Sequence, residues 1–251
     1  MVTMNKTDRV HATRELILTA AERLYAEHGV LAVSNRQISE AAGQGNNTAV
    51  GYHFGTKADL VRAIARRHSA PIEELRQRRL TEIGGSTELR DWIGCLVRPV
   101  AEHLATVGSP TWFARFGAQV MTDPSLRPII VEESLSSPSL VRIVDGLYRC
   151  LPDLPADVLA ERTDMARQLL VHMVAERERA LAEGTPTPRS SWHGAATGLI
   201  DALVGLWLAP VTAHPNGGIA AGGAAVRSSA GAAARSRGPA RGGGRSPRGK
   251  R

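Results

Sequence analysis

Residues 34–60 read SNRQISEAAGQGNNTAVGYHFGTKADL and predict two short helices separated by a polar turn. Ser34 and Gln37 have the spacing of a capping box, in which the serine hydroxyl accepts a hydrogen bond from a first-turn amide and the glutamine side chain reaches back. Gly43 stands where a helix commonly ends in a left-handed residue. The turn through Asn46 and Asn47 then leads into a second short helix over 48–54.

Longer helices are predicted on both sides of this pair. Over 13–28 the apolar residues recur every three or four positions, as on one face of a helix. Thr56 is expected to cap a further helix, and Pro71 to kink or end it, because proline removes an internal hydrogen bond. Two short helices joined by a glycine-containing turn and supported by longer helices are typical of a helix-turn-helix.

Three stretches of the chain resemble the DNA-binding domain of the TetR family of transcriptional regulators. They are ILTAAERLYAEHG at 17–29, SNRQISEAAG at 34–43 and VGYHFGTKADL at 50–60. The chain has one residue more than the common family spacing between Gly43 and Phe54, and Gly51 stands where many members have an aromatic residue. The resemblance implies an all-α fold: an N-terminal three-helix helix-turn-helix DNA-binding domain over 11–70 and a C-terminal helical ligand-binding and dimerisation domain over 71–214.

The resemblance also indicates which residues contact DNA. A recognition helix presents its N-terminal residues to base edges in the major groove, while neighbouring residues bind the backbone phosphates. The residues expected to face bases are Asn46, Asn47, Thr48, Ala49, Tyr52 and His53. Those expected to hold phosphates are Ser34, Arg36, Lys57 and again Tyr52. Two alternatives stay open: Asn46 or Asn47 caps the helix, and Phe54 belongs to the core.

The rest of the folded chain is expected to consist of long helices separated by proline or glycine. The predicted spans are 87–107, 110–122, 124–151, 155–183 and 191–208, with Pro138 as a possible break in the third. The last helix is apolar on more than one face, which points to a buried position such as a subunit interface.

A homodimer through the last two helices is therefore expected, as the resemblance implies. The residues assigned to its interface are Leu169, Met173, Leu199, Leu203, Leu206 and Trp207. The alternative is that the last helix belongs to the core of a single chain. A two-fold dimer would set two recognition helices at a spacing that matches a palindromic operator.

The resemblance implies a small-molecule effector, and the sequence offers only a broad set of residues for its pocket. These candidates are Trp92, Cys95, His103, Trp112, Phe113, Phe116, Met121, Tyr148 and Met173. For each of them the alternative is a plain core residue, which is the more common case, and periodicity cannot separate the two. No cofactor or metal is expected, because His103 and His172 have no partners at metal-ligand spacing.

Charge is distributed unevenly along the 251 residues, whose formal net charge is +7. Residues 215–251 contain eight basic residues, no acidic residue and ten glycines, so we expect a disordered basic tail. Such a segment either binds phosphates without sequence preference or has no role. A non-specific nucleic-acid-binding protein driven by this tail is the alternative to a sequence-specific regulator.

Other protein classes are disfavoured by what the sequence lacks. Two cysteines, Cys95 and Cys150, do not make a disulfide scaffold, and the N-terminus shows no secretory signal. We expect a soluble, cytoplasmic chain that does not bind membranes. The sequence contains none of the common hydrolase or nucleotide-binding motifs, so an enzyme is not expected. The leading hypothesis is a ligand-responsive repressor that dissociates from its operator when the ligand binds; activation is the other possible direction of control.

Overall fold

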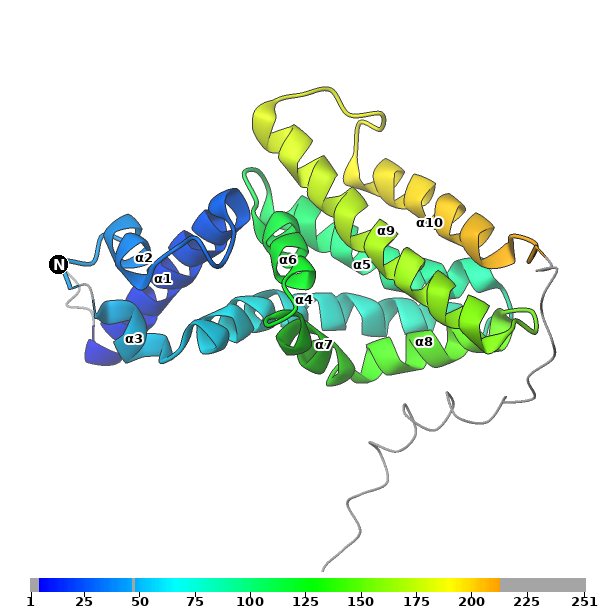
Figure 1. The fold of residues 1–251 in the computed structure, drawn as a ribbon, viewed down its shortest axis with the longest axis horizontal. Helices are drawn as coiled ribbons and strands as arrows, with labels where there is room; N and C mark the ends of the chain where they lie inside the picture. The colour runs from blue at the N-terminus through cyan, green and yellow to red at the C-terminus, as the bar shows by residue number, and fades with distance from the viewer. Residues whose placement is uncertain (1–4, 47, 213–251) are drawn as a thin grey trace, which may run out of the picture.

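The computed structural model describes residues 5–46 and 48–212, and within these ranges every regular element is an α-helix. Figure 1 shows α1, α2 and α3 forming a small head at one end of an elongated molecule, with the other helices forming a larger body. The helices are α1 (Lys6–His28), α2 (Asn35–Ala41), α3 (Ala49–Phe54), α4 (Lys57–Ile83), α5 (Leu89–Val107), α6 (Phe113–Thr122), α7 (Arg127–Leu135), α8 (Pro138–Cys150), α9 (Ala156–Glu183) and α10 (Trp192–Leu208). The all-α prediction is confirmed.

The helix boundaries follow local capping chemistry. The Gln37 amide donates to Ser34 Oγ at 3.3 Å and the Ser34 amide donates to Gln37 Oε1 at 2.8 Å, which is the expected capping box at the start of α2. Thr56 and Asp59 form a second capping box at the start of α4. The first helix begins seven residues before the predicted start, because the Asn5 side chain caps it.

The fourth helix does not end at Pro71. It continues as one element to Ile83, and Pro71 lies on its exposed side. The carbonyl that loses its amide partner to the proline belongs to Arg67, an exposed residue, so water can bind that carbonyl at little cost. The continuous helix therefore crosses residue 70, where the sequence suggested a domain boundary, and connects the head to the body (Figure 1).

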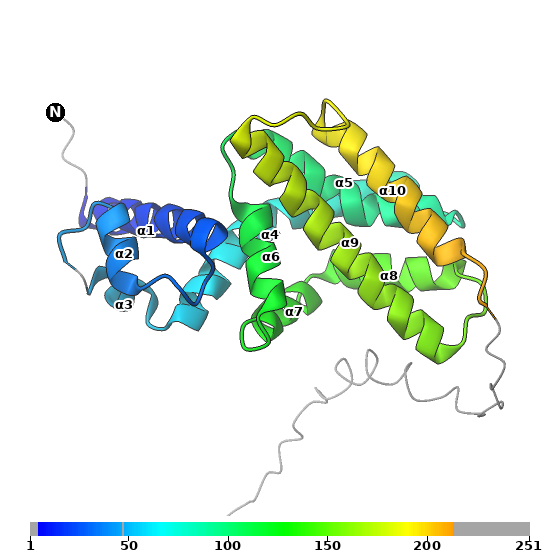
Figure 2. The same cartoon turned by 45° about the horizontal axis from the view of Figure 1, so that its top comes forward.

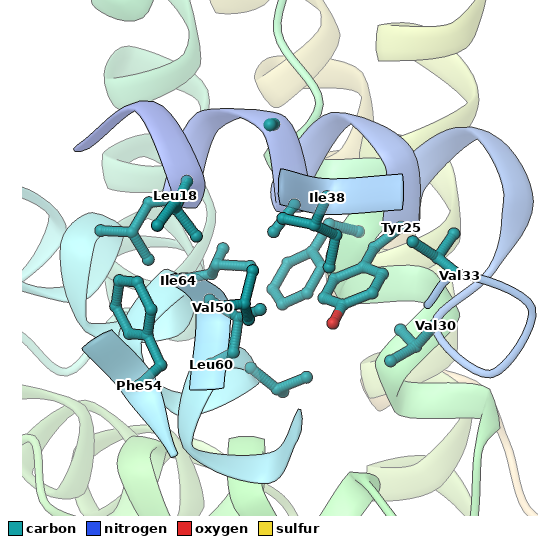
Figure 3. Close-up of a cluster of buried hydrophobic side chains, with 14 of the residues drawn as sticks. Leu18, Tyr25, Val30, Val33, Ile38, Val50, Phe54, Leu60 and Ile64 are labelled. Carbon is teal, nitrogen blue, oxygen red and sulfur yellow. The ribbon is translucent and has the colours of Figure 1, made fainter. Parts of the chain in front are cut away.

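The helices of the head pack around an apolar cluster. Figure 3 shows side chains from α1, α2, α3 and α4 pointing toward one another, among them Leu18, Tyr25, Ile38 and Val50. The same buried cluster continues into α6 and α7, where the Phe116 ring stacks on Tyr25 with 6.2 Å between ring centroids. Apolar packing thus runs from the head into the adjoining helices of the body.

The core of the body forms around α5. Its buried residues pack against α4, α8 and α10, and Figures 1 and 2 show α9 and α10 side by side along one face of the body. Residues 124–151 form two helices, α7 and α8, with the break before Pro138. Gly146 of α8 lies against the ring of Trp92, and an added Cβ would be 2.2 Å from Trp92 Cε3.

In the described ranges no helix has both the length and the hydropathy needed to cross a membrane. The basic segment 215–251 lies outside the described residues, so its disorder stays a prediction.

Candidate nucleic-acid interface

The short helix α3 presents two different faces because it has only six residues. Ala49, Val50 and Phe54 point into the head core, where each is at most 9% exposed. On the other side, Tyr52 is 83% exposed, and nothing lies within 4 Å of a Cβ added at Gly51. The outer face of α3 is therefore open to a macromolecule that approaches the tip of the head.

The turn before α3 orients the first residues of this face. The Thr48 amide and hydroxyl both donate to Asn46 Oδ1, at 2.9 and 2.7 Å. Asn46 thus closes a turn onto Thr48, which is the N-cap residue of α3 and has no side-chain cap hydrogen bond; the alternative that Asn46 caps the helix is not what the structure has. Asn46 and Thr48 are both exposed, and the Asn46 NH₂ group is not used in the bond to Thr48.

The residues predicted to contact DNA divide into four groups. Ser34, Arg36, Asn46, Thr48 and Tyr52 are exposed on the head, His53 and Lys57 are half-buried, Ala49 is in the core, and Asn47 lies outside the described residues. The position of Ala49 differs from the prediction, because a six-residue helix that must bury one side cannot present every residue to a partner. Phe54 likewise lies in the core.

Arg14 of α1 was not identified from the sequence, yet it holds the end of α3. Its guanidinium donates to the His53 carbonyl and lies 4.3 Å from the centroid of the Phe54 ring. A cation is favourable at a helix C-terminus, where the last carbonyls lack amide partners. Burial and the charge of Arg14 lower the pKa of His53, so its imidazole is neutral at neutral pH and can both donate and accept a hydrogen bond.

Lys57 stabilises the loop between α1 and α2. Its Nζ donates to the carbonyls of Val30 and Val33, at 2.9 and 2.8 Å, and burial lowers its pKa. These two bonds leave one of the three N–H groups of the ammonium available to a phosphate. The exposed Arg36 is paired with Glu40 at 2.7 Å, and a DNA phosphate would compete with that carboxylate.

Helix α6 is held to α9 by a buried carboxylate. Glu178 is 2% exposed and accepts hydrogen bonds from Thr111 Oγ1 at 2.7 Å and from the amides of Ala114 and Arg115 at 3.2 and 2.9 Å. The guanidinium of Arg115 adds a charged contact at 3.3 Å. Glu178 therefore binds the N-terminus of α6, the helix that also packs against α1.

The candidate effector residues line neither of the two hollows described below. Trp92 and Cys95 belong to the body core, Phe116 belongs to the cluster shared with the head, and Tyr148 and Met173 are exposed. Trp112 and Phe113 pack against the shared cluster, while His103 and Met121 are buried. A hollow between α5 and α10, lined by Arg98, Trp192 and other residues, has a volume of about 70 Å³, which is too small for a typical effector.

Of the residues assigned to a dimer interface, some are buried within the single chain and others lie on its surface. Leu199, Leu203 and Trp207 are buried in the core of the single chain, because this side of α10 packs on α5. Met173 is 53% exposed on α9. Leu169 and Leu206 line an open groove of about 640 Å³ along α9 and α10, together with Glu161, Asp164, Met165, Gln168 and His172.

No group of three or more His, Cys, Asp or Glu side chains in residues 5–46 and 48–212 is arranged to hold a metal ion. Burial raises the pKa of the Cys95 thiol to about 11, which makes the thiolate scarce at neutral pH.

Two family profiles match the chain. The profile described as "Bacterial regulatory proteins, tetR family" matches residues 17–64, and the profile described as "Tetracyclin repressor-like, C-terminal domain" matches residues 94–205. Together the two regions take in more than half of the chain.

Curated relatives agree with these profiles. The HTH-type transcriptional repressor AcnR of Corynebacterium glutamicum is 37% identical over 68 residues, which is 27% of this chain and 36% of that protein. The AcnR of Corynebacterium diphtheriae is 29% identical over 153 residues, or 58% of this chain and 72% of that protein. The first alignment thus spans about a third of its relative's length.

A solved structure has the same fold. NalD, the secondary repressor of the MexAB-OprM multidrug efflux pump in Pseudomonas aeruginosa, aligns with a TM-score of 0.50 at 24% identity. The alignment covers 77% of this chain and 96% of that chain.

Proposed function

This chain belongs to the TetR family of bacterial regulatory proteins, and from that premise we propose that it is a repressor released from a palindromic operator by a small molecule. It would bind this double-stranded DNA as a homodimer in the cytoplasm. TetR-family regulators are non-enzymatic transcription factors, so we assign the chain no catalytic residue and no cofactor.

The observation that carries this proposal is the outer face of α3. Thr48 and Tyr52 expose hydroxyl groups at the tip of the head, with Asn46 beside them. Hydroxyl and amide groups can bind base edges in the major groove, while Ser34 and Arg36 at the start of α2 are suited to phosphates. We therefore propose Ser34, Arg36, Asn46, Asn47, Thr48, Tyr52, His53 and Lys57 as the DNA-binding set.

A dimer supplies the symmetry of the proposed operator. The groove along α9 and α10 combines apolar side chains, such as Met165 and Leu169, with polar groups at Glu161 and His172. An apolar strip with a polar rim is the composition of a protein interface. We propose that a second copy of the chain covers this groove, so that the two heads lie on one side of the DNA.

The effector would act through the difference in its affinity for two arrangements of the dimer. A ligand that binds more tightly to the arrangement in which the heads no longer match the operator lowers DNA affinity. Since the hollow of about 70 Å³ is too small for a typical effector, we propose that side chains of the body move to admit it.

The test is selection of bound fragments from genomic DNA at about 0.15 M salt, near physiological ionic strength. The full chain and a 1–214 truncation are compared. We expect both to recover one two-fold-symmetric motif, and we expect Thr48→Ala to change the base preference at one position of each half-site. Recovery of no motif, with binding lost on truncation, would refute the proposal and favour non-specific binding by the basic tail.

A further inference from the structure

Three buried polar side chains from three helices form one hydrogen-bonded chain where the head meets the body. His68 Nε2 lies 2.9 Å from Glu22 Oε2, and His68 Nδ1 lies 2.7 Å from His103 Nε2. Glu22 and His68 are each 5% exposed, and His103 is 7% exposed. The DNA-binding residues proposed above include none of them.

The helices that carry these three hydrogen-bonded side chains lie where the head joins the body. Glu22 is on α1 of the head, His68 is on the connecting helix α4, and His103 is on α5 of the body. The Phe113 ring of α6 stacks on His68 with 4.0 Å between centroids and 16° between planes. Figure 1 shows α6 on the side of the body that adjoins the head. Side chains of α1, α4, α5 and α6 meet at this point.

The hydrogen bonds of this chain can all be satisfied at once. When Glu22 accepts the Nε2–H of a neutral His68, the Nδ1 of His68 is left as an acceptor for the Nε2–H of His103. Removing one member leaves a buried polar group without a partner, which is costly in an environment of low polarity.

Directional bonds at this point restrict how the head can turn. The contacts between α1 and α6 include apolar pairs such as Tyr25 against Phe116, and apolar surfaces tolerate small rotations. Arg67 of α4 adds a second directional bond to α1, since its guanidinium donates to Thr19 Oγ1 at 3.0 Å. A hydrogen bond weakens steeply when its angle changes. The polar chain therefore favours one angle of α1 against α4 and α5.

We propose that Glu22, His68 and His103 are positioning residues that set the angle of the head and thereby select the half-site spacing of the operator. The inference rests on the proposed function, because half-site spacing has meaning only for a dimer that binds a two-fold-symmetric DNA site. In such a dimer the separation of the two recognition helices must match the separation of the half-sites. Loss of the polar chain broadens the spacings that are accepted and leaves the contacts within each half-site intact.

The experiment uses the full chain and the operator motif recovered by fragment selection. Affinities are measured for that operator, for versions with the half-sites one or two base pairs closer or further apart, and for DNA with a single half-site. His103→Leu removes the hydrogen bond between His68 and residue 103, at the body end. Glu22→Leu removes the hydrogen bond between His68 and residue 22, at the head end. Glu22→Gln keeps an acceptor for His68. His28→Gln, at the exposed end of α1, is the matched control.

We expect both leucine variants to lose about 3- to 10-fold of the discrimination between the selected spacing and its neighbours. Glu22→Gln and His28→Gln are expected to keep the wild-type profile, and single half-site affinity is expected to stay within about twofold throughout. A general loss of stability would lower that single-site affinity as well. Because the two breaks are at opposite ends, either variant decides the question if the other fails to fold.

An unchanged spacing profile in a folded leucine variant would overturn this inference and leave the proposed function standing. Failure of the wild-type chain to recover any symmetric motif would overturn both.

Discussion

Replacing Glu178 by alanine is expected to loosen α6 from α9 and to destabilise the whole protein. The Glu178 carboxylate receives hydrogen bonds from the Thr111 hydroxyl, two backbone amides at the start of α6 and the Arg115 guanidinium. The variant leaves these donors without a partner in a mostly buried place and also removes the negative charge from the helix N-terminus. Breaking a buried ion pair from one side costs about 3–5 kcal/mol.

The expected loss is large enough to measure directly. For a protein of this size, about 3 kcal/mol lowers the Tm by roughly 6–12 °C. Unfolding in urea, followed by circular dichroism at one fixed protein concentration, gives the free energy of unfolding. The fixed concentration matters because the proposed dimerisation would make the apparent stability depend on it.

A matched control lies two residues away on the same helix. Glu176 pairs with Arg179 at 3.6 Å on the surface, and Glu176→Ala is expected to cost no more than about 0.5 kcal/mol. Glu178→Gln keeps an acceptor and should lose about 1–2 kcal/mol. If Glu178→Ala were no more destabilised than Glu176→Ala, the assignment of Glu178 as the residue that holds α6 would be wrong.

Three further outcomes are expected. Burial lowers the pKa of His103 from 6.5 to about 4, so between these two pH values the unfolded protein binds a proton that the folded protein does not. The free energy of unfolding should therefore fall by about 3 kcal/mol as the pH drops from 6.5 to 4. In urea unfolding, His103→Gln should show a flatter dependence of stability on pH over this range. Gly146→Ala sets a Cβ against Trp92 and should cost about 1–3 kcal/mol in the same assay, whereas Gly117→Ala, with open space around its Cβ, should cost nothing. Lys57→Ala should weaken binding to all DNA sequences alike and lower the slope of log affinity against log salt by about one. A loss of affinity confined to one operator position would contradict a phosphate contact.

The sequence predicted best those features that depend on neighbours within three or four residues. The capping box at Ser34 and the cap at Thr56 each join a side chain to an amide three positions away, so their chemistry is visible in the residue order. The break before Pro138 is of the same kind, because proline fixes its own backbone angle. The start of α1 was missed since its first turns carry few apolar residues, and only the cap at Asn5 marks them.

The candidate site was predicted less completely because it depends on contacts between distant residues. Periodicity over six residues of α3 could not separate Ala49, which is buried, from the exposed Thr48. The apolar pattern of α10 indicated burial correctly but could not distinguish the side that packs on α5 from an outer side, and Leu203 belongs to the former. Glu22 and His68 are 46 residues apart in sequence, and no local pattern relates them.

Because α4 is one continuous helix, a tilt of its body end also moves its head end. Its 27 residues correspond to a length of about 40 Å at 1.5 Å per residue. With the pivot at His68, the arm to the head end of α4 at Lys57 is eleven residues, or about 17 Å. A tilt of about 5° displaces that end by roughly 1.5 Å, and opposite tilts in the two copies of the proposed dimer change the separation of the heads by about 3 Å, close to the rise of one base pair along DNA.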